Sequence, residues 1–183
     1  MNGPSEGGTP EIESDRILRE EIVYTTQWFD LVSREVEGHG VHYVVEANDY
    51  VIVLAQSIEG ILLVRQFRPA VNAHTLELPA GHVDAGETPR RAAERELLEE
   101  TGHRSDRFEL LGSLKPDTGR LGNRLWCYFA ADARPTGATF EMDVVTMPWD
   151  ELRSAIATGS FDAALHIAAI GLAVARGVLP STT

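Results

Sequence analysis

The sequence predicts an α+β domain, an α/β/α sandwich in which a mixed sheet lies between helices, preceded by a small antiparallel β unit. Short strand-like runs dominate the first half of the 183 residues, a strongly marked helix interrupts them, and two more helical segments close the chain. A hydrophobic fraction of 43% can fill a core of ordinary size. We expect a disordered tail over residues 1–14, the β unit over 15–47 and the main domain over 48–183.

The front β unit is expected to hold three strands. Residues 20–26 and 31–37 flank Gln27-Trp28-Phe29-Asp30, and a turn at Glu37–Gly40 leads into residues 41–47. A three-stranded unit of this size is not stable alone. We therefore expect it to dock on another surface.

The main domain begins with two strongly apolar segments. Residues 50–56 and 61–67 are joined by a short turn, and their continuous hydrophobicity predicts strands buried on both faces. The later segments predict three strands and then two helices, in this order: 108–114, 123–130, 141–147, 149–157 and 162–176.

A helix with clear boundaries lies between these strands. Thr88 is a natural N-cap, Pro89 suits the first helical position, and Gly102 suits the position just past the end. One side of the helix is apolar and should pack inward. That side contains Ala93 and Leu97, with Ala92 and Leu98 at its margins.

The opposite side of this helix carries three glutamates. Glu96, Glu99 and Glu100 are three or four residues apart, so they share one face and repel each other by about 0.2–0.5 kcal/mol per pair. Arg95 relieves only part of this repulsion. Hard cations such as Mg²⁺ or Mn²⁺ prefer oxygen ligands and would turn the face into a binding site. A solvated acidic face is the alternative interpretation.

Composition narrows the class of protein. The net charge of −12 argues against a nucleic-acid or anionic-membrane surface, and a polyanionic substrate would need local arginines and metal ions. Cys127 is the sole cysteine and is expected to be a buried, inert thiol. No secretory signal or run of 18 apolar residues is visible, so we expect a soluble, cytoplasmic protein.

The glycine loop and helix together resemble the Nudix box. Gly81 is followed after five residues by Glu87 and after seven more by Arg95-Glu96-Leu97-Leu98-Glu99-Glu100-Thr101-Gly102, and only His103 departs from the aliphatic residue usual there. The resemblance covers roughly residues 45–176. It implies an enzyme that hydrolyses pyrophosphate bonds with two or more Mg²⁺ ions, or Mn²⁺ in their place. It also implies a set of metal ligands and helpers: Glu96, Glu99, Glu100 and the Ala80 carbonyl as ligands, Arg95 orienting Glu99, and Glu87 in an outer sphere.

The segment before the box resembles ADP-ribose pyrophosphatases. Gln66-Phe67-Arg68-Pro69 followed by Glu77-Leu78-Pro79-Ala80-Gly81 carries this similarity. It implies that Arg68 contacts the diphosphate of a nucleoside diphosphate sugar and that Glu77 accepts hydrogen bonds from the ribose or base. For Arg68, a surface arginine at a strand end is the alternative.

The resemblance also implies roles for residues outside the core motif. In relatives the front unit exchanges across a two-fold homodimer and stacks an aromatic residue on the base, which makes Trp28 the candidate and Phe29 the second choice. A Trp that only plugs a core is the alternative. A general base is expected on the loop before a late strand, at Glu141 or else Asp143, although Glu141 could simply face solvent on a strand.

Two other functions remain open at this stage. The spacing of Pro116 and the segment Asp117–Arg120 depart from the ADP-ribose subfamily, which leaves a broader nucleoside diphosphate sugar hydrolase in view. A house-cleaning nucleoside triphosphate pyrophosphohydrolase would lack the front unit. A non-catalytic nucleotide-sensing module would have lost its helix glutamates, and here all three are present.

Overall fold

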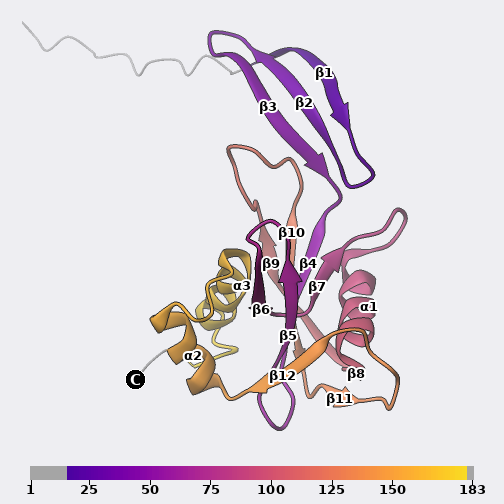
Figure 1. Cartoon of the computed structure of the whole chain (residues 1–183), viewed down its shortest axis with the longest axis vertical. Helices are drawn as coiled ribbons and strands as arrows, with labels where there is room; N and C mark the ends of the chain where they lie inside the picture. Colours follow the sequence, from indigo (N-terminus) through magenta and orange to yellow (C-terminus); the bar gives the residue numbers. More distant parts are fainter. Residues whose placement is uncertain (1–15, 181–183) are drawn as a thin grey trace, which may run out of the picture. The chain divides into compact units, whose positions relative to one another are not determined.

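The computed structural model describes residues 16–180, shown in Figure 1. The tail predicted at residues 1–14 lies outside the described residues. The chain divides into two units between Glu46 and Ala47, and each unit has its own internal contacts.

The N-terminal unit is a three-stranded sheet in the order β1-β2-β3. Strand β1 (Ile17–Thr25) pairs antiparallel with β2 (Phe29–Val36), and β3 (Gly40–Ala47) lies on the other side of β2. Every residue of β1 is exposed, and Val32 of β2 is the single buried hydrophobic residue among the described residues of this unit. Three strands are confirmed, but the sheet has almost no interior of its own.

The second unit contains the mixed sheet that the sequence predicts. Four strands form a sheet in the order β7-β4-β10-β9, in which β10 runs parallel to β4 and antiparallel to β9. Three strands form a sheet in the order β12-β5-β6, and β11 pairs with β8. The strands span the following residues: β4 Tyr50–Ala55, β5 Ile61–Arg68, β6 Ala73–Glu77, β7 Ala80–His82, β8 His103–Arg104, β9 Arg107–Leu114, β10 Leu125–Ala131, β11 Arg134–Pro135 and β12 Asp143–Met147.

Three helices cover these sheets, with α1 (Pro89–Thr101) on one side and α2 (Trp149–Thr158) and α3 (Ala164–Ala175) on the other (Figure 1). Alternate residues of β4 face the two sides, because side chains in a strand point alternately to opposite faces. Ile52 and Leu54 belong to the core cluster beneath α2 and α3, while Val51 and Val53 belong to the cluster beneath α1. This layering confirms the α/β/α prediction and places α1 against the centre of the sheet.

The sequence predicts burial correctly for β4, but for β5 the prediction holds only in the first half of the strand. All but the first residue of β4 is buried, but in β5 the buried run stops after Val64. The expectation that residues 61–67 are buried on both faces is therefore wrong for their second half. The second half of β5 carries Arg65 and Arg68, which reach other polar side chains.

Several short strands escaped prediction because their pairing comes from distant partners. Strands β7, β8 and β11 are only two or three residues long. Strand β12 begins at Asp143, so Glu141 precedes the strand instead of opening it. Cys127 lies in the core, where burial raises the pKa of its thiol to about 12, as expected for an inert thiol. Within residues 16–180 no helix is long and apolar enough to cross a membrane.

Candidate active site

Helix α1 has the boundaries that its sequence predicts. The Thr88 hydroxyl accepts a hydrogen bond from the Arg91 amide, and Pro89 is the first helical residue. Gly102 ends the helix in the left-handed conformation, with φ of 67°, which a side-chain-bearing residue rarely adopts. Ala92, Ala93 and Leu97 are buried, whereas Leu98 is partly exposed. The apolar side therefore fixes which way the glutamates point.

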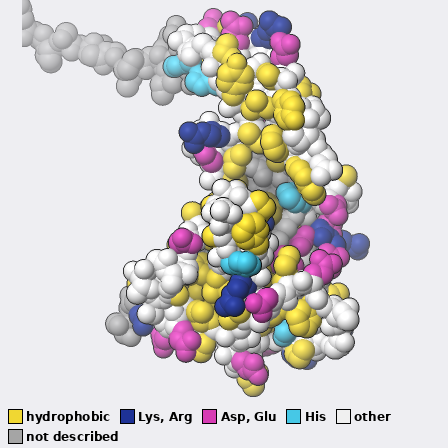
Figure 2. All heavy atoms as spheres, in the orientation of Figure 1, with side chains coloured by type: hydrophobic (Ala, Val, Ile, Leu, Met, Phe, Trp, Pro, Cys, Tyr) yellow, Lys and Arg dark blue, Asp and Glu magenta, His cyan; other side chains and the backbone are white. Residues whose placement is uncertain are grey.

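Three of the four glutamates of α1 share an edge of the helix but differ in exposure. The side chain of Glu99 is 48% exposed, that of Glu96 is 12% exposed, and Glu100 is buried. Figure 2 shows acidic and basic side chains gathered on the part of the surface that contains α1. The sequence placed these residues on one face but did not distinguish the exposed glutamate from the two that turn inward.

Glycine at position 81 makes room for Glu96. A Cβ atom at Gly81 would lie 2.0 Å from Oε1 of Glu96, which is far inside van der Waals contact. A side chain at residue 81 would therefore force the Glu96 carboxylate to move from its place beside β7. The first glycine of the motif allows this close approach between a backbone and a carboxylate.

Glu100 is held by the backbone of the same short strand. Its Oε2 accepts a hydrogen bond of 2.9 Å from the Ala80 amide, and burial raises its pKa to about 7. Burial also raises the pKa of Glu96, although Arg95 opposes that shift. Two inward-facing carboxylates thus lie beside β7: Glu96 is paired with Arg95, and Glu100 is held by a backbone amide.

Arg95 connects more groups than the sequence suggested. Its guanidinium donates to Glu99 over 3.2 Å, as predicted, and also to Glu96 over 2.7 Å and to the His82 carbonyl over 2.9 Å. Glu87 accepts two further hydrogen bonds and is the largest cause of the raised pKa of Arg95. Arg95 therefore ties the glycine loop to the helix.

The donor atoms at this edge of α1 are of the chemical type that a hard divalent cation prefers. Among the described residues, no three His, Cys, Asp or Glu side chains already stand together as a metal-holding group. The carboxylates of Glu96 and Glu99 instead share Arg95, while Glu100 turns to the Ala80 amide. All of these donors are oxygen atoms, which suits Mg²⁺ or Mn²⁺ and does not suit a soft metal.

Arg68 lines a cavity of about 450 Å³. Strand β7 contributes His82 to the same wall, so the cavity and the buried Glu100 are joined through one three-residue strand. Tyr50 packs edge-on against His82, with ring centroids 5.5 Å apart. The remaining wall comes from the loop before β10 and the start of α3, through Pro116, Leu121, Asn123, Ala163, Ala164, Leu165 and His166.

Glu77 is buried behind Arg68 and holds its guanidinium. Arg68 donates from Nε to Oε1 over 2.8 Å and from Nη2 to Oε2 over 2.6 Å, which is the two-pronged arrangement that arginine forms with carboxylates. Thr75 and His166 also contact this carboxylate. The structure therefore shows Glu77 engaged with protein groups, and a direct contact of Glu77 with ribose or base stays a prediction.

The two base candidates occupy different surroundings. The Glu141 amide donates to the Glu99 carbonyl over 3.0 Å, which places exposed Glu141 at the carboxyl end of α1. Asp143 is the first residue of β12, where its carboxylate meets Arg65 at 3.4 Å. Of the two, Glu141 is the one attached to the glutamate-bearing helix.

Trp28 lies between β1 and β2 and is 65% exposed. Its amide donates to the Thr26 hydroxyl, which shapes the tight connection between these strands. An exposure this large is not that of a residue that fills the core of its own unit. Neighbouring Phe29 is also exposed.

Sequence reasoning assigned no role to Tyr50 or His166, although both line the cavity with Arg68. His166 is 88 residues from its hydrogen-bonding partner Leu78, and no local pattern connects the two. The continuous apolar run of β4 marks Tyr50 only as the start of a strand. Neither residue carried a signal that could have found it.

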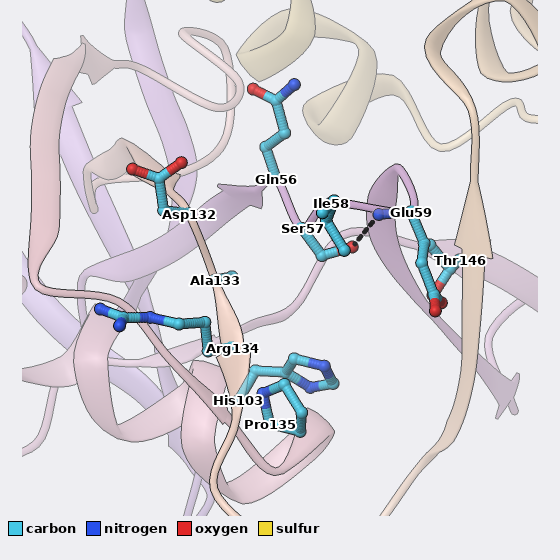
Figure 3. Close-up of a pocket in the computed structure, with 10 residues that line it drawn as sticks. All are labelled: Gln56, Ser57, Ile58, Glu59, His103, Asp132, Ala133, Arg134, Pro135 and Thr146. Carbon is cyan, nitrogen blue, oxygen red and sulfur yellow. Dashed lines mark hydrogen bonds between the residues drawn. The ribbon is translucent and has the colours of Figure 1, made fainter.

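A larger cavity, of about 720 Å³, lies elsewhere in the second unit (Figure 3). It contains none of the predicted site residues. His103, which departs from the Nudix pattern, lines it next to Pro135, and Nδ1 of His103 lies 2.7 Å from the Thr101 carbonyl. The His103 ring thus turns back onto the end of α1 without touching the glutamates.

Comparisons with known proteins identify the family of this chain. A family model described as NUDIX domain matches residues 46–164. The CMP-5'-(N-acetyl-N-hydroxy-3-aminopropyl)phosphonate hydrolase of Streptomyces rubellomurinus is 31% identical over 170 residues, covering 86% of this chain and 82% of that protein. The ADP-ribose pyrophosphatase of Bacillus subtilis is 34% identical over 94 residues, covering 49% of this chain, and the match spans only about half of the relative, 51%.

A solved structure has a similar fold. The crystal structure of an ADP compounds hydrolase superposes with a TM-score of 0.78 over 90% of this chain and 94% of that chain, at 21% identity. Identity this low supports the fold alone. The covered share of this chain is larger than residues 47–183 alone.

Proposed function

The chain belongs to the NUDIX domain family, and we propose that it hydrolyses the pyrophosphate bond of ADP-ribose or a related nucleoside diphosphate sugar. The products would be a nucleoside monophosphate and a sugar phosphate. The observation that carries the proposal is that β7 borders both the buried Glu100 and the cavity at Arg68. Its Ala80 amide holds Glu100, and its His82 lines the cavity that contains Arg68.

In this proposal the carboxylates of α1 and a backbone carbonyl of β7 hold the metal ions. Glu96, Glu99, Glu100 and the Ala80 carbonyl are the ligands, and two or more Mg²⁺ or Mn²⁺ ions would bind there. Such ions neutralise phosphoryl oxygens and lower the pKa of a bound water. Arg95 keeps Glu99 and Glu96 in place through the hydrogen bonds described above.

The protein's own side chains would orient the substrate. Arg68 meets the diphosphate with the edge of its guanidinium that Glu77 does not occupy, because Glu77 takes Nε and Nη2. The cavity beside Arg68 would receive the nucleoside or the sugar against Tyr50 and Leu121. Glu141 is the proposed general base, and its attachment to Glu99 supports this role.

We further propose that residues 48–183 form the catalytic domain and that the N-terminal unit joins two chains into a homodimer. The unit exposes many large hydrophobic side chains, and Figure 2 shows hydrophobic side chains spread over its visible face. Exposed apolar surface of this extent is typical of a protein interface. In the homodimer Trp28 would stack on the base bound by the partner. The exposed hydrophobic residues are Ile17, Leu18, Ile22, Val23, Tyr24, Trp28, Phe29, Val41 and Tyr43.

A substrate panel tests the reaction directly. Purified protein with Mg²⁺ should release nucleoside monophosphate from ADP-ribose, ADP-glucose, GDP-mannose or UDP-glucose, and reaction in ¹⁸O-labelled water should label one of the two products. Nucleoside triphosphates and a CMP-linked phosphonate serve as comparison substrates. Release of inorganic pyrophosphate from triphosphates, with no cleavage of any diphosphate sugar, would replace the proposal with a triphosphate pyrophosphohydrolase.

A further inference from the structure

His166 is a buried titratable residue to which the proposed reaction assigns no role. It is the third residue of α3, its side chain is 6% exposed, and its edge forms part of the wall of the cavity at Arg68. Its Nδ1 accepts a hydrogen bond of 3.1 Å from the Leu78 amide, and its Nε2 lies 3.2 Å from Oε2 of Glu77. Both ring nitrogens are therefore used.

These two contacts fix the proton on the imidazole ring. A backbone amide can only donate, so Nδ1 must be the acceptor, and the neutral ring carries its hydrogen on Nε2. That hydrogen points at Glu77. His166 therefore acts as a donor to the carboxylate, in an orientation set by the backbone of the segment between β6 and β7.

The Glu77 carboxylate receives donors on both oxygens. Thr75 donates to Oε1 over 2.6 Å, and His166 lies 3.2 Å from Oε2. Gln66 makes a longer contact of 3.4 Å with Oε2, while Arg68 donates to both oxygens. Burial would raise the pKa of Glu77, but the hydrogen bonds from Arg68, His166 and Thr75 outweigh burial and hold it well below its usual range. The carboxylate is thus an anion whose plane is clamped from both sides.

The plane of Glu77 determines the pose of Arg68. A two-pronged contact is strong only when carboxylate and guanidinium are nearly coplanar. Arg68 is 38% exposed and so has freedom on its cavity side, whereas Glu77 is fixed behind it. Without His166, Oε2 keeps only Arg68 and the long contact from Gln66. The carboxylate then rotates more freely about its last torsion, and the guanidinium rotates with it.

We propose that His166 is a positioning residue that acts through Glu77 to hold the Arg68 guanidinium in its anion-binding orientation at the cavity. The inference rests on the proposed role of Arg68 toward the diphosphate. His166 itself does not touch the reacting atoms. It links α3, which lines part of the cavity, to the arginine that also lines it.

The kinetic test uses His166→Ala in the full-length protein with Mg²⁺ and ADP-ribose. Loss of ground-state binding predicts a KM raised by about tenfold, with kcat changed by less than about threefold. Added imidazole should lower the raised KM most of the way back to the wild-type value, because the space that His166 vacates opens to the cavity. His166→Gln, which keeps one acceptor and one donor, should have an intermediate KM.

Ile167→Ala is the matched control, since Ile167 is the next residue of α3 and packs against the core without lining the cavity. It should lower thermal stability as much as His166→Ala and leave KM unchanged. Equal increases of KM in both variants, or no increase in His166→Ala, would overturn the proposal. Circular dichroism shows whether each variant is folded.

A second measurement does not depend on turnover and so separates this proposal from the proposed function. The Arg68 Nε–H signal in a ¹H–¹⁵N spectrum, assigned by its loss in Arg68→Lys, should exchange slowly with water in the wild type. We expect exchange to be about tenfold faster in His166→Ala and unchanged in Ile167→Ala. Unchanged exchange in His166→Ala would refute the positioning role, even if the wild-type enzyme cleaves ADP-ribose. Faster exchange in an inactive protein would retain the positioning role and reject only the substrate.

Discussion

Helix α1 and strand β1 show opposite relations between a segment and its own unit. The apolar side of α1 is buried against the sheet, so the positions of its glutamates are fixed within residues 47–180. All nine residues of β1 are exposed, including Ile22, Val23 and Tyr24. The comparison teaches that packing within one unit is enough to place the α1 glutamates. The N-terminal unit leaves most of its large hydrophobic side chains exposed.

The largest effect should come from Glu100, on the self-contained side of this comparison. Glu100→Gln keeps the size of the side chain and an acceptor for the Ala80 amide but removes the negative charge. We expect kcat to fall at least about 100-fold and the apparent affinity for Mg²⁺ to weaken. The fold should survive, because a buried neutral amide costs no more than a buried carboxylate. Steady-state kinetics over a Mg²⁺ titration measures both effects.

Glu94→Gln is the matched control on the same helix. Glu94 is exposed and pairs with Arg90 on the surface, where an ion pair contributes little. Its rate should stay at the wild-type level. A Glu100→Gln enzyme that also retains wild-type rate would mean that α1 is not the metal-binding element, and a nucleotide-sensing module would then account better for the motif.

A smaller but still large effect is expected from Gly81→Ala. The new Cβ would require the space now held by Oε1 of Glu96, at 2.0 Å, so the carboxylate must move. We expect kcat to fall by roughly 10–100-fold, because a displacement of about 1 Å in a catalytic group has effects of that size. Overpacking should also lower the free energy of unfolding by about 1–3 kcal/mol. Kinetics and chemical denaturation measure the two effects.

Gly171→Ala is the same substitution at a second glycine, and here we expect stability to rise instead of fall. Gly171 lies in α3, and a Cβ there meets nothing within 4 Å. Stability should therefore rise by about 0.5–1 kcal/mol, since alanine is favoured over glycine inside a helix. If Gly81→Ala behaved like Gly171→Ala, the close approach of β7 to Glu96 would not be essential.

The same comparison explains how much the sequence could predict. The caps of α1 were predictable because Thr88, Pro89 and Gly102 act on the backbone within a few residues of themselves. The fold class was predictable because the apolar runs of β4 and β5 require coverage on their faces. These are local signals, and the structure confirms them.

Longer-range features had no such signal. The burial of Glu77 depends on Arg68 nine residues earlier and His166 far along the chain. A sequence reading treats Glu77 as an available acceptor, because glutamate is usually exposed. Likewise, β7 owes its existence to pairing with β4, and only that pairing brings Ala80 to Glu100. Such contacts arise from tertiary packing and leave no local pattern.

The smallest effect on kinetics is expected from a substitution in the N-terminal unit. Trp28→Ala removes an exposed indole and should raise KM for ADP-ribose by about fivefold to tenfold, because stacking on a base contributes about 1–3 kcal/mol. The value of kcat should change little. Size-exclusion chromatography with light scattering should still report a dimer, since a single side chain is removed.

Ile22→Glu tests whether Trp28 acts in its own chain or in the partner's cavity. A carboxylate introduced at this exposed apolar position of β1 should separate the chains, because an unpaired charge is costly to bury in an interface. If Trp28 serves the partner's cavity, the monomer should show the same rise in KM as Trp28→Ala, and combining the two variants should add nothing further. A monomeric Ile22→Glu enzyme with wild-type KM would place the whole nucleotide site within one chain. The exposed indole would then need another explanation.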